Sequence, residues 1–400
     1  MKNYMLCHKC GKKSEIRKVA KCPECGGILT VEYMDEYLDS IAEDLKKKEK
    51  QTMWDFREVM PDISEKNVVT FREGCTPLVK STEIAADFGM KELYMKDETK
   101  NPTGSFKDRS VSVCVSMAKE LNCPGVVVSS SGNGGAATGA YGVKGNVDTI
   151  IFVPEKTPVG KVAQAICYGG DVIKVRGNFS YSYNAAVAMA EQKNYMNVTT
   201  TYLSPFGLEG YKTIAYEIFD DLKKAPDFIF IPVGAGPVLY GVYKGFEEMR
   251  KMKWVEKIPR LICCQAKGCA PISEAWMENR KTVSCKDPKT IASAISDPLA
   301  GYEDDGDITV ETIRKSNGIA LAIEDEKILE AGRMLARKDG FFVEASSAAS
   351  LAGLKELMER GEVGKDDCCV CLLTGHGLKD SAAYVPENLE IPVINTIEDL

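Results

Sequence analysis

A Gly/Ser turn leads into a predicted helix and places one lysine at its start, in the stretch Asn101-Pro-Thr-Gly-Ser-Phe-Lys107-Asp-Arg109. The positive end of a helix dipole disfavours a lysine cation, so we expect the pKa of Lys107 to be lowered. A neutral amine is a nucleophile, which makes Lys107 a candidate for covalent catalysis. An ordinary exposed lysine in a turn is the alternative.

Apolar, β-rich runs alternate with helical patterns along the chain that follows this stretch. The predicted strands are 125–129, 148–153, 171–175, 228–233, 261–265, 319–323 and 368–373. The predicted helices are 108–121, 135–142, 159–168, 181–193, 209–223, 325–338 and 346–360. Continuous apolar strands separated by helices of this length indicate mostly parallel sheets covered on both faces. Outside the pattern, we expect a surface helix or connector at 34–50 and an irregular surface excursion at 279–315.

The composition is that of an ordinary globular protein: 400 residues, of which 44% are hydrophobic and 27% charged. Only two histidines are present, His8 and His376, which excludes a multi-histidine metal centre. General acid–base catalysis must then use mostly Lys, Asp, Glu or Tyr side chains. The net charge of −7 argues against nucleic acid as a partner of the whole protein. We find neither a signal peptide nor a membrane span, so we expect no membrane partner.

Most of the 15 cysteines lie in apolar runs, as the adjacent pair Cys263 and Cys264 does. An odd count and adjacent pairs indicate buried thiols rather than a disulfide framework. Thiols persist in a reducing compartment, so we expect the protein to be cytoplasmic.

Four cysteines near the start of the chain form two C-x-x-C pairs, Cys7 with Cys10 and Cys22 with Cys25. Two such turns can present four thiolates to one ion, which predicts a tetrahedral zinc site. Four protein ligands leave no open position, so this zinc would be structural. A metal-free pair of turns is one alternative. A nucleic-acid-binding ribbon is another, because six basic residues and one acid lie between positions 9 and 21.

Three further strand-to-loop junctions are rich in small residues. They are 128–137 (VSSSGNGGAA), 231–241 (IPVGAGPVLYG) and 372–380 (LLTGHGLKD). In an α/β sheet, ligands bind at such junctions. The first offers N–H groups to a carboxylate, although Asn133 could simply cap a helix there, and the second lets backbone donors approach a phosphate. Thr374 and His376 are expected at the carboxyl end of the last strand.

Together these segments resemble the threonine synthases, members of the tryptophan synthase β-like, fold type II pyridoxal-phosphate enzymes. The residues that carry the resemblance are KDETKNPTGSFKDR (96–109), SSGN (130–133), LEGYKT (208–213), GCAP (268–271) and TGHGLKD (374–380). The resemblance covers 7–380 and includes the cysteine pairs. It implies two doubly wound, mostly parallel α/β domains with an N-terminal zinc-ribbon-like knuckle, in a homodimer. The knuckle would be 1–32, the large cofactor-binding domain 33–125 with 206–400, and the small domain 126–205.

The resemblance also implies roles for individual residues. Lys107 corresponds to the lysine that forms a Schiff base with pyridoxal 5'-phosphate, and Phe106 to the residue under its ring. Asn133 corresponds to the partner of the cofactor's 3′-oxygen, and Thr374 to the hydroxyl partner of its pyridine nitrogen. The cofactor's phosphate would be held by Gly234, Ala235, Gly236, Pro237 and Val238. The amino-acid substrate would be bound by Ser130, Ser131, Gly132 and Lys212.

The implied activity is the conversion of O-phosphohomoserine and water to threonine and phosphate, by elimination and β-replacement. Three positions depart from the family's pattern: Gly207, where some members have an arginine for the substrate phosphate, Gly134, where threonine is common, and Pro237, which has no N–H donor. The candidates to replace that arginine are Lys144, Lys161, Arg176 and Lys212.

These departures leave open a second activity on the same fold. The chain could be a serine/threonine ammonia-lyase, or another pyridoxal-phosphate-dependent β-elimination or β-replacement enzyme. A non-catalytic binding protein on the same scaffold is a third interpretation, which the intact Lys107, Asn133 and Thr374 disfavour.

Overall fold

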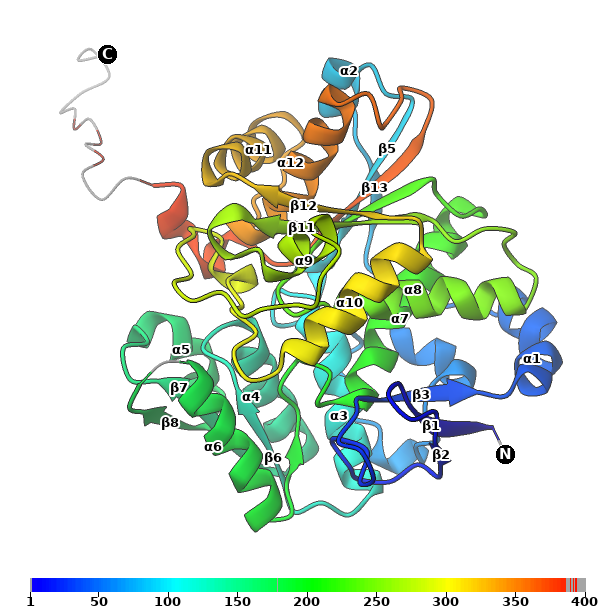
Figure 1. Cartoon of the computed structure of the whole chain (residues 1–400), viewed down its shortest axis with the longest axis vertical. Coiled ribbons are helices and arrows are strands. Elements are labelled where there is room, and N and C mark those ends of the chain that lie inside the picture. Colours follow the sequence, from blue (N-terminus) through cyan, green and yellow to red (C-terminus); the bar gives the residue numbers. More distant parts are fainter. Residues whose placement is uncertain (1, 178, 386–388, 390, 392, 394–400) are drawn as a thin grey trace.

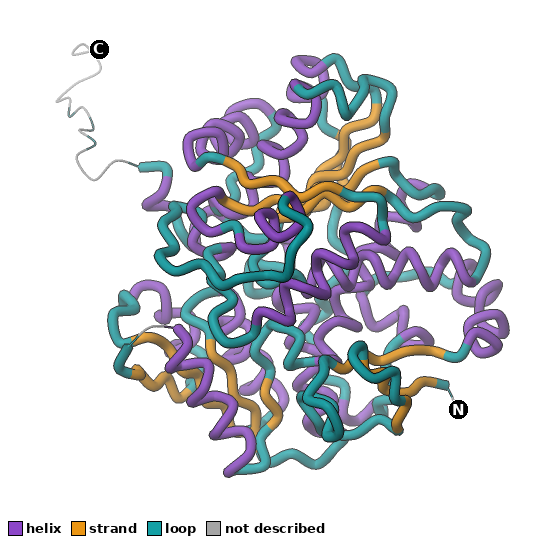
Figure 2. Tube along the Cα trace, in the orientation of Figure 1, coloured by secondary structure: helices purple, strands orange, loops and turns teal. Residues whose placement is uncertain are grey.

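The computed structural model describes residues 2–177, 179–385, 389, 391 and 393, and its strands form three sheets (Figure 1). The strands are β1 (Asn3–Cys7), β2 (Lys13–Ser14), β3 (Leu29–Tyr33), β4 (Leu78–Lys80), β5 (Glu92–Asp97), β6 (Gly125–Ser129), β7 (Asp148–Pro154), β8 (Asp171–Val175), β9 (Met196–Asn197), β10 (Phe228–Pro232), β11 (Arg260–Ala266), β12 (Ile319–Ile323) and β13 (Cys368–Leu373). Figure 2 shows the strands gathered into three separate groups.

Helices connect and cover these sheets. They are α1 (Asp35–Lys47), α2 (Glu83–Phe88), α3 (Lys107–Glu120), α4 (Asn133–Gly145), α5 (Val159–Cys167), α6 (Phe179–Gln192), α7 (Pro205–Leu222), α8 (Pro237–Lys251), α9 (Pro271–Met277), α10 (Glu303–Lys315), α11 (Asp325–Lys338) and α12 (Ala345–Glu359). Every strand and helix predicted from the sequence is present, with ends that differ by a few residues. No helix of the described chain combines the length and the hydropathy that crossing a bilayer would require.

The six-stranded sheet has the order β12-β11-β10-β13-β5-β4, and its strands are parallel except for β4, which runs antiparallel to β5. Its central strands are apolar at every position because both faces are covered. Along β10, Phe228 and Phe230 belong to the core shared with α11 and α12, whereas Ile229 and Ile231 belong to the core shared with α7 and α8. This is the doubly wound arrangement that the continuous apolar runs predicted.

The four-stranded sheet has the order β8-β7-β6-β9 and is entirely parallel. All its strands come from 125–197, and helices α4, α5 and α6 lie between them in the chain. The carboxyl end of β6 runs directly into the turn before α4. In Figure 1 this sheet lies below the six-stranded one, and α3, α7 and α10 lie between the two.

The N-terminal sheet is small and antiparallel, with the order β2-β1-β3. Its two C-x-x-C turns follow β1 and precede β3. The predicted connector at 34–50 is helix α1, which buries Leu38, Ala42 and Leu45. It is therefore an amphipathic helix packed on the core.

The expectation of an irregular surface excursion at 279–315 is wrong for its second half. Residues Glu303–Lys315 form α10, which has acidic residues in its first turn and basic residues in its last turn. This charge order suits the helix dipole, and the helix buries Val310 and Ile313. The acidic run that suggested a surface loop is the start of this helix. The first half is irregular, but residues 293–298 line the cavity described below.

Candidate active site

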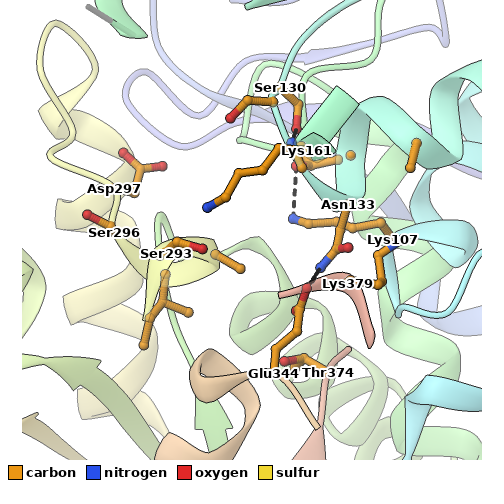
Figure 3. A pocket seen from close by; sticks show the side chains of 18 of the residues that line it. Lys107, Ser130, Asn133, Lys161, Ser293, Ser296, Asp297, Glu344, Thr374 and Lys379 are labelled. Atoms are coloured by element: carbon orange, nitrogen blue, oxygen red, sulfur yellow. Dashed lines mark hydrogen bonds between the residues drawn. The ribbon is translucent and has the colours of Figure 1, made fainter. Parts of the chain in front are cut away.

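A cavity of about 470 Å³ opens where the loops after β6, β10 and β13 converge with α5 and residues 293–298 (Figure 3). The first three loops are those that the sequence singled out. The loops after β10 and β13 lie together because the carboxyl ends of parallel strands point to the same edge of their sheet, and the loop after β6 meets them from the carboxyl edge of the four-stranded sheet. The cavity therefore brings together candidate residues from both of the parallel sheets.

Lys107 lines this cavity as the first residue of α3. Its Nζ donates a hydrogen bond to Thr200 Oγ1 over 2.8 Å and lies 4.6 Å from the centre of the Phe106 ring. Burial in the cavity lowers the pKa of Lys107 to about 8, although the negative charges of Asp297 and Glu344 oppose the shift. The pKa of Lys107 is therefore lowered, as expected, and burial is the cause of the shift.

The turn after β6 exposes Ser130, Ser131 and Gly132 to the cavity at the start of α4. No side chain caps this helix, so its first N–H groups face the cavity with the positive end of the helix dipole. Asn133 is the first residue of α4 and its Nδ2 donates to both oxygens of Glu344, over 3.1 and 2.9 Å. The turn can receive a carboxylate, and Asn133 is held at its edge.

The loop after β10 also lines the cavity, with residues 234–238. Gly236 has a φ of +110°, and a Cβ there would lie 1.9 Å from Thr309 Oγ1. Only glycine fits this position, where the backbone turns from β10 into α8. Pro237 occupies the first turn of α8, where a missing N–H removes no helical hydrogen bond. Residues without large side chains and a helix N-terminus make this loop suitable for a phosphate.

Thr374 follows β13 and lines the cavity, with its Oγ1 2.9 Å from Ser347 Oγ. His376 is absent from the lining, and its Nδ1 instead accepts a hydrogen bond from the Leu378 N–H over 3.1 Å. Thr374 and His376 both follow the carboxyl end of β13, as expected. Only Thr374 reaches the cavity.

Lys212 lies outside the cavity, and its prediction as a substrate-binding residue is wrong. Its Nζ is fully buried between α7 and α8, where it pairs with Glu209 at 2.7 Å and Glu248 at 2.9 Å. The ammonium group also lies 4.0 Å from the centre of the Tyr33 ring. Lys212 therefore belongs to a buried ion cluster that packs two helices against β3.

Sequence reasoning missed Glu344, which lines the cavity next to Asn133. Burial raises the pKa of Glu344 to about 7, against the opposing effects of the Asn133 hydrogen bond and the Lys379 charge. One feature of the sequence could have revealed Glu344. It is a single acidic residue between the apolar run 341–343 and helix α12, whose first residues are small. Nothing in the sequence marks Thr200 or residues 293–298 as neighbours of Lys107.

The four cysteines of the predicted zinc site lie together, away from this cavity. Their Sγ atoms are all within 4.8 Å of one another. His8 is engaged elsewhere, because its Nε2 lies 3.0 Å from Thr30 Oγ1. Four sulfur atoms so close together, without a disulfide among them, form a donor set suited to one tetrahedral ion.

Comparisons with known proteins agree with this geometry. The family model described as "Pyridoxal-phosphate dependent enzyme" matches residues 69–375. Threonine synthase of Methanocaldococcus jannaschii is 39% identical over 383 residues, which cover 95% of this chain and 93% of that protein. Threonine synthase of Methanosarcina acetivorans is 37% identical and covers 96% of this chain and 93% of that protein. Maize serine racemase has a similar fold, with a TM-score of 0.66 and 23% identity over 76% of this chain and 88% of that one.

Proposed function

The chain belongs to the threonine synthase family of pyridoxal-phosphate-dependent, fold type II enzymes, and we propose that it converts O-phosphohomoserine and water to threonine and phosphate. One observation carries the proposal: Lys107, with its lowered pKa, lies in a cavity whose lining includes a turn suited to a carboxylate and a loop suited to a phosphate. Elimination of the γ-phosphate followed by addition of water at the β-carbon needs a base near the α-carbon, and Lys107 can supply it.

The cavity fits pyridoxal phosphate as the cofactor. Lys107 would bind it covalently, with Phe106 below the ring, and residues 234–238 would hold its phosphate. Asn133 and Thr374 place an amide and a hydroxyl at the cavity wall, suited to the 3′-oxygen and the ring nitrogen. When bound, the cofactor withdraws electrons from the substrate and weakens bonds at its α-carbon and beyond. A neutral hydroxyl at the ring nitrogen favours elimination and replacement at side-chain carbons.

The remaining steps belong to side chains of this chain. The turn of Ser130, Ser131 and Gly132 would hold the substrate carboxylate against the first N–H groups of α4. Thr200 Oγ1 accepts a hydrogen bond from Lys107 Nζ and so orients the amine. With the substrate in the cavity, the free Lys107 amine would take a proton from the substrate α-carbon and return one later.

A lyase acting on serine or threonine is the second candidate. One observation favours it: no arginine is among the described residues that line the cavity. A phosphorylated substrate normally benefits from a bidentate arginine.

A product assay decides between the two candidates. The holoenzyme is incubated separately with O-phosphohomoserine, serine and threonine, and phosphate, threonine and 2-oxo acid are measured. We expect equal amounts of threonine and phosphate from O-phosphohomoserine. Oxo acid from serine or threonine, with no threonine from O-phosphohomoserine, would replace this proposal with the lyase.

We also propose that the four clustered cysteines bind one structural zinc ion. Metal analysis of the purified protein should give about one zinc per chain, because four thiolates complete a tetrahedral site. The Cys22→Ser variant should lose this zinc, and it should unfold at a lower denaturant concentration because metal binding contributes to folding. Cys167→Ser is the control, since Cys167 is exposed and outside the cluster. Unchanged zinc content in Cys22→Ser would refute the site.

Three further proposals concern the organisation of the chain. The division into three sheets supports a knuckle at 1–32, a large domain at 33–125 with 206–400, and a small domain at 126–205, although β3 continues to Tyr33 and β6 begins at Gly125. All 15 cysteines are unpaired, which supports a reducing, cytoplasmic location. The family resemblance supports a homodimer.

A further inference from the structure

Asp297 lies in the wall of the cavity, in the segment 293–298 between α9 and α10. Figure 3 shows its carboxyl group across the cavity from Lys107 and Asn133. Asp297 and Lys107 act on each other electrostatically, because the negative charge of Asp297 opposes the lowering of the Lys107 pKa. A molecule bound between them therefore has an amine on one side and a carboxyl group on the other.

The two oxygens of Asp297 differ in what they contact. Oδ1 accepts a hydrogen bond from the Tyr302 hydroxyl over 2.5 Å and another from the Leu299 N–H over 3.0 Å. No described residue donates to Oδ2, which is not among the buried atoms that lack a partner and so remains accessible. Oδ2 can therefore accept a hydrogen bond or a proton from a bound molecule.

Asp297 forms no ion pair with any residue of the described chain, although Lys107 shares the cavity with it. Burial raises the pKa of its carboxyl group, and the Tyr302 and Leu299 hydrogen bonds and the Lys107 charge oppose this shift. A carboxyl group held out of water without a cationic partner costs stability. Such groups are frequent at catalytic sites, because a raised pKa suits proton exchange near neutral pH.

The orientation of this carboxyl group is fixed by contacts from both parallel-sheet regions. The Tyr302 ring, which holds Oδ1, stacks on Tyr183 of α6 with ring centres 4.6 Å apart and planes 17° apart. On the other side, a Cβ built at Gly234 would lie 3.4 Å from Asp297 Cβ, so the loop after β10 packs against Asp297. Oδ2 is therefore held in place before a substrate arrives.

The position of Asp297 relative to the substrate follows from the other walls of the cavity. The turn that includes Ser130 suits the substrate carboxylate, and Lys107 must lie next to the α-carbon. In Figure 3, Ser130, Lys107 and Asp297 lie on three different sides of the cavity. A substrate that places its carboxylate at the first and its α-carbon at the second directs its side chain towards the third.

We infer that Asp297 is the base for the water that adds to the substrate β-carbon. This inference rests on the proposed function and assigns a residue to its second half. The water oxygen forms a bond to the β-carbon of the dephosphorylated substrate, and one of its O–H bonds breaks. That proton passes to Asp297 Oδ2, which later releases it to solvent. The electron pair of the double bond between the α- and β-carbons takes a proton from Lys107, which completes threonine.

The partition between products of the holoenzyme tests the inference. Asp297→Asn keeps the size of the side chain but removes the base. We expect phosphate release from O-phosphohomoserine to continue, while the threonine formed per phosphate falls at least about ten-fold, as loss of a general base predicts. The unhydrated substrate should leave as 2-oxobutanoate and ammonia, which are measured in the same reaction. Equal amounts of threonine and phosphate from Asp297→Asn would overturn the inference.

Two further variants distinguish catalysis from a structural role. Tyr302→Phe removes the hydroxyl that holds Oδ1 and keeps the ring that stacks on Tyr183, so it should shift the partition in the same direction by a smaller factor. Asp304→Asn is the matched control, because Asp304 is exposed in the first turn of α10 and lies outside the cavity. A structural role alone would lower kcat in Asp297→Asn and Tyr302→Phe without changing the threonine formed per phosphate.

A binding measurement separates this inference from the proposed function. Threonine and 2-aminobutanoate differ only in the β-hydroxyl, and each is titrated into the holoenzyme with cofactor absorbance as the readout. We expect the wild type to bind threonine on the order of ten-fold more tightly, and Asp297→Asn to lose most of this preference, because a hydrogen bond to a charged group is removed. An unchanged preference would overturn the inference. If the wild type forms no threonine from O-phosphohomoserine, the proposed function fails, and this titration alone decides whether Asp297 contacts an oxygen at the β-carbon.

Discussion

Replacing Lys107 with alanine is expected to abolish turnover of O-phosphohomoserine, with a fall in kcat of at least about 10³-fold. The amine has two roles, as the covalent attachment point of the cofactor and as the base at the substrate α-carbon, and each contributes strongly to catalysis. Lys107 lines the cavity as the first residue of α3, and its Nζ lies 4.6 Å from the centre of the Phe106 ring. Phosphate release measures the effect.

Covalent attachment is checked separately from activity. Borohydride reduction of the wild-type holoenzyme should fix the cofactor to the peptide that contains Lys107, and mass spectrometry should find no such label in Lys107→Ala. The control is Lys100→Ala, since Lys100 is 61% exposed and outside the cavity. Retained turnover, or a label on another lysine in the wild type, would contradict the assignment of Lys107.

The fold could be predicted from the sequence where the apolar runs are continuous. The parallel strands β6, β7, β10, β11, β12 and β13 are buried on both faces, so their pattern needs no partner to be recognised. Helix α10 was missed because its acidic start looks like a solvated loop. Strand β5 was missed because its sequence, Glu92–Asp97, mixes charged and apolar residues. Its Lys96 is buried only because Glu217, 121 positions later, neutralises it.

The candidate site could be predicted only as far as backbone motifs define it. The small-residue turns at 130–133 and 234–238 have conformations that the local sequence dictates, and both line the cavity. Long side chains are different, because their reach depends on what packs beside them. In the sequence, Lys212 and Lys161 are equally plausible phosphate ligands. In the structure, Lys212 is buried between Glu209 and Glu248, whereas Lys161 lines the cavity. Only the packing of α5 and α7 distinguishes them.

Glu217→Gln is expected to cause the largest loss of stability, about 3–5 kcal/mol of the free energy of unfolding. Glu217 is buried on α7 and accepts hydrogen bonds from Arg109 Nη2 at 2.7 Å and from Lys96 Nζ at 2.8 Å. A neutral glutamine would leave Arg109 with Glu98 as its remaining carboxylate partner, 2.6 Å from Nε, and would leave Lys96 Nζ with the Thr76 carbonyl oxygen at 2.7 Å. Urea denaturation of the holoenzyme, followed by circular dichroism, measures the loss.

The pH dependence of stability is a second test of the ion pairs that Glu217 makes with Arg109 and Lys96. Burial alone would raise the pKa of Glu217, but the charges of Arg109 and Lys96 outweigh it and lower the pKa to about 2. The carboxylate therefore contributes stability above its ordinary pKa of 4.5, and this contribution disappears as the pH falls through about 2. The difference in stability between wild type and Glu217→Gln should therefore be constant from neutral pH to about 5 and shrink as the pH falls from about 4.5 towards 2.

Glu43→Gln is the matched control, because it removes the same charge from an exposed helix. Glu43 is 78% exposed and pairs with Lys47 at 3.3 Å one turn along α1, so its loss should cost under about 0.5 kcal/mol. Because Arg109 lies two residues after Lys107 on α3, the cluster also fixes the start of the helix that presents the amine. Glu217→Gln should therefore bind the cofactor more slowly as well as unfold more easily. Equal unfolding midpoints for the two variants would show that the buried cluster contributes no more than a surface ion pair.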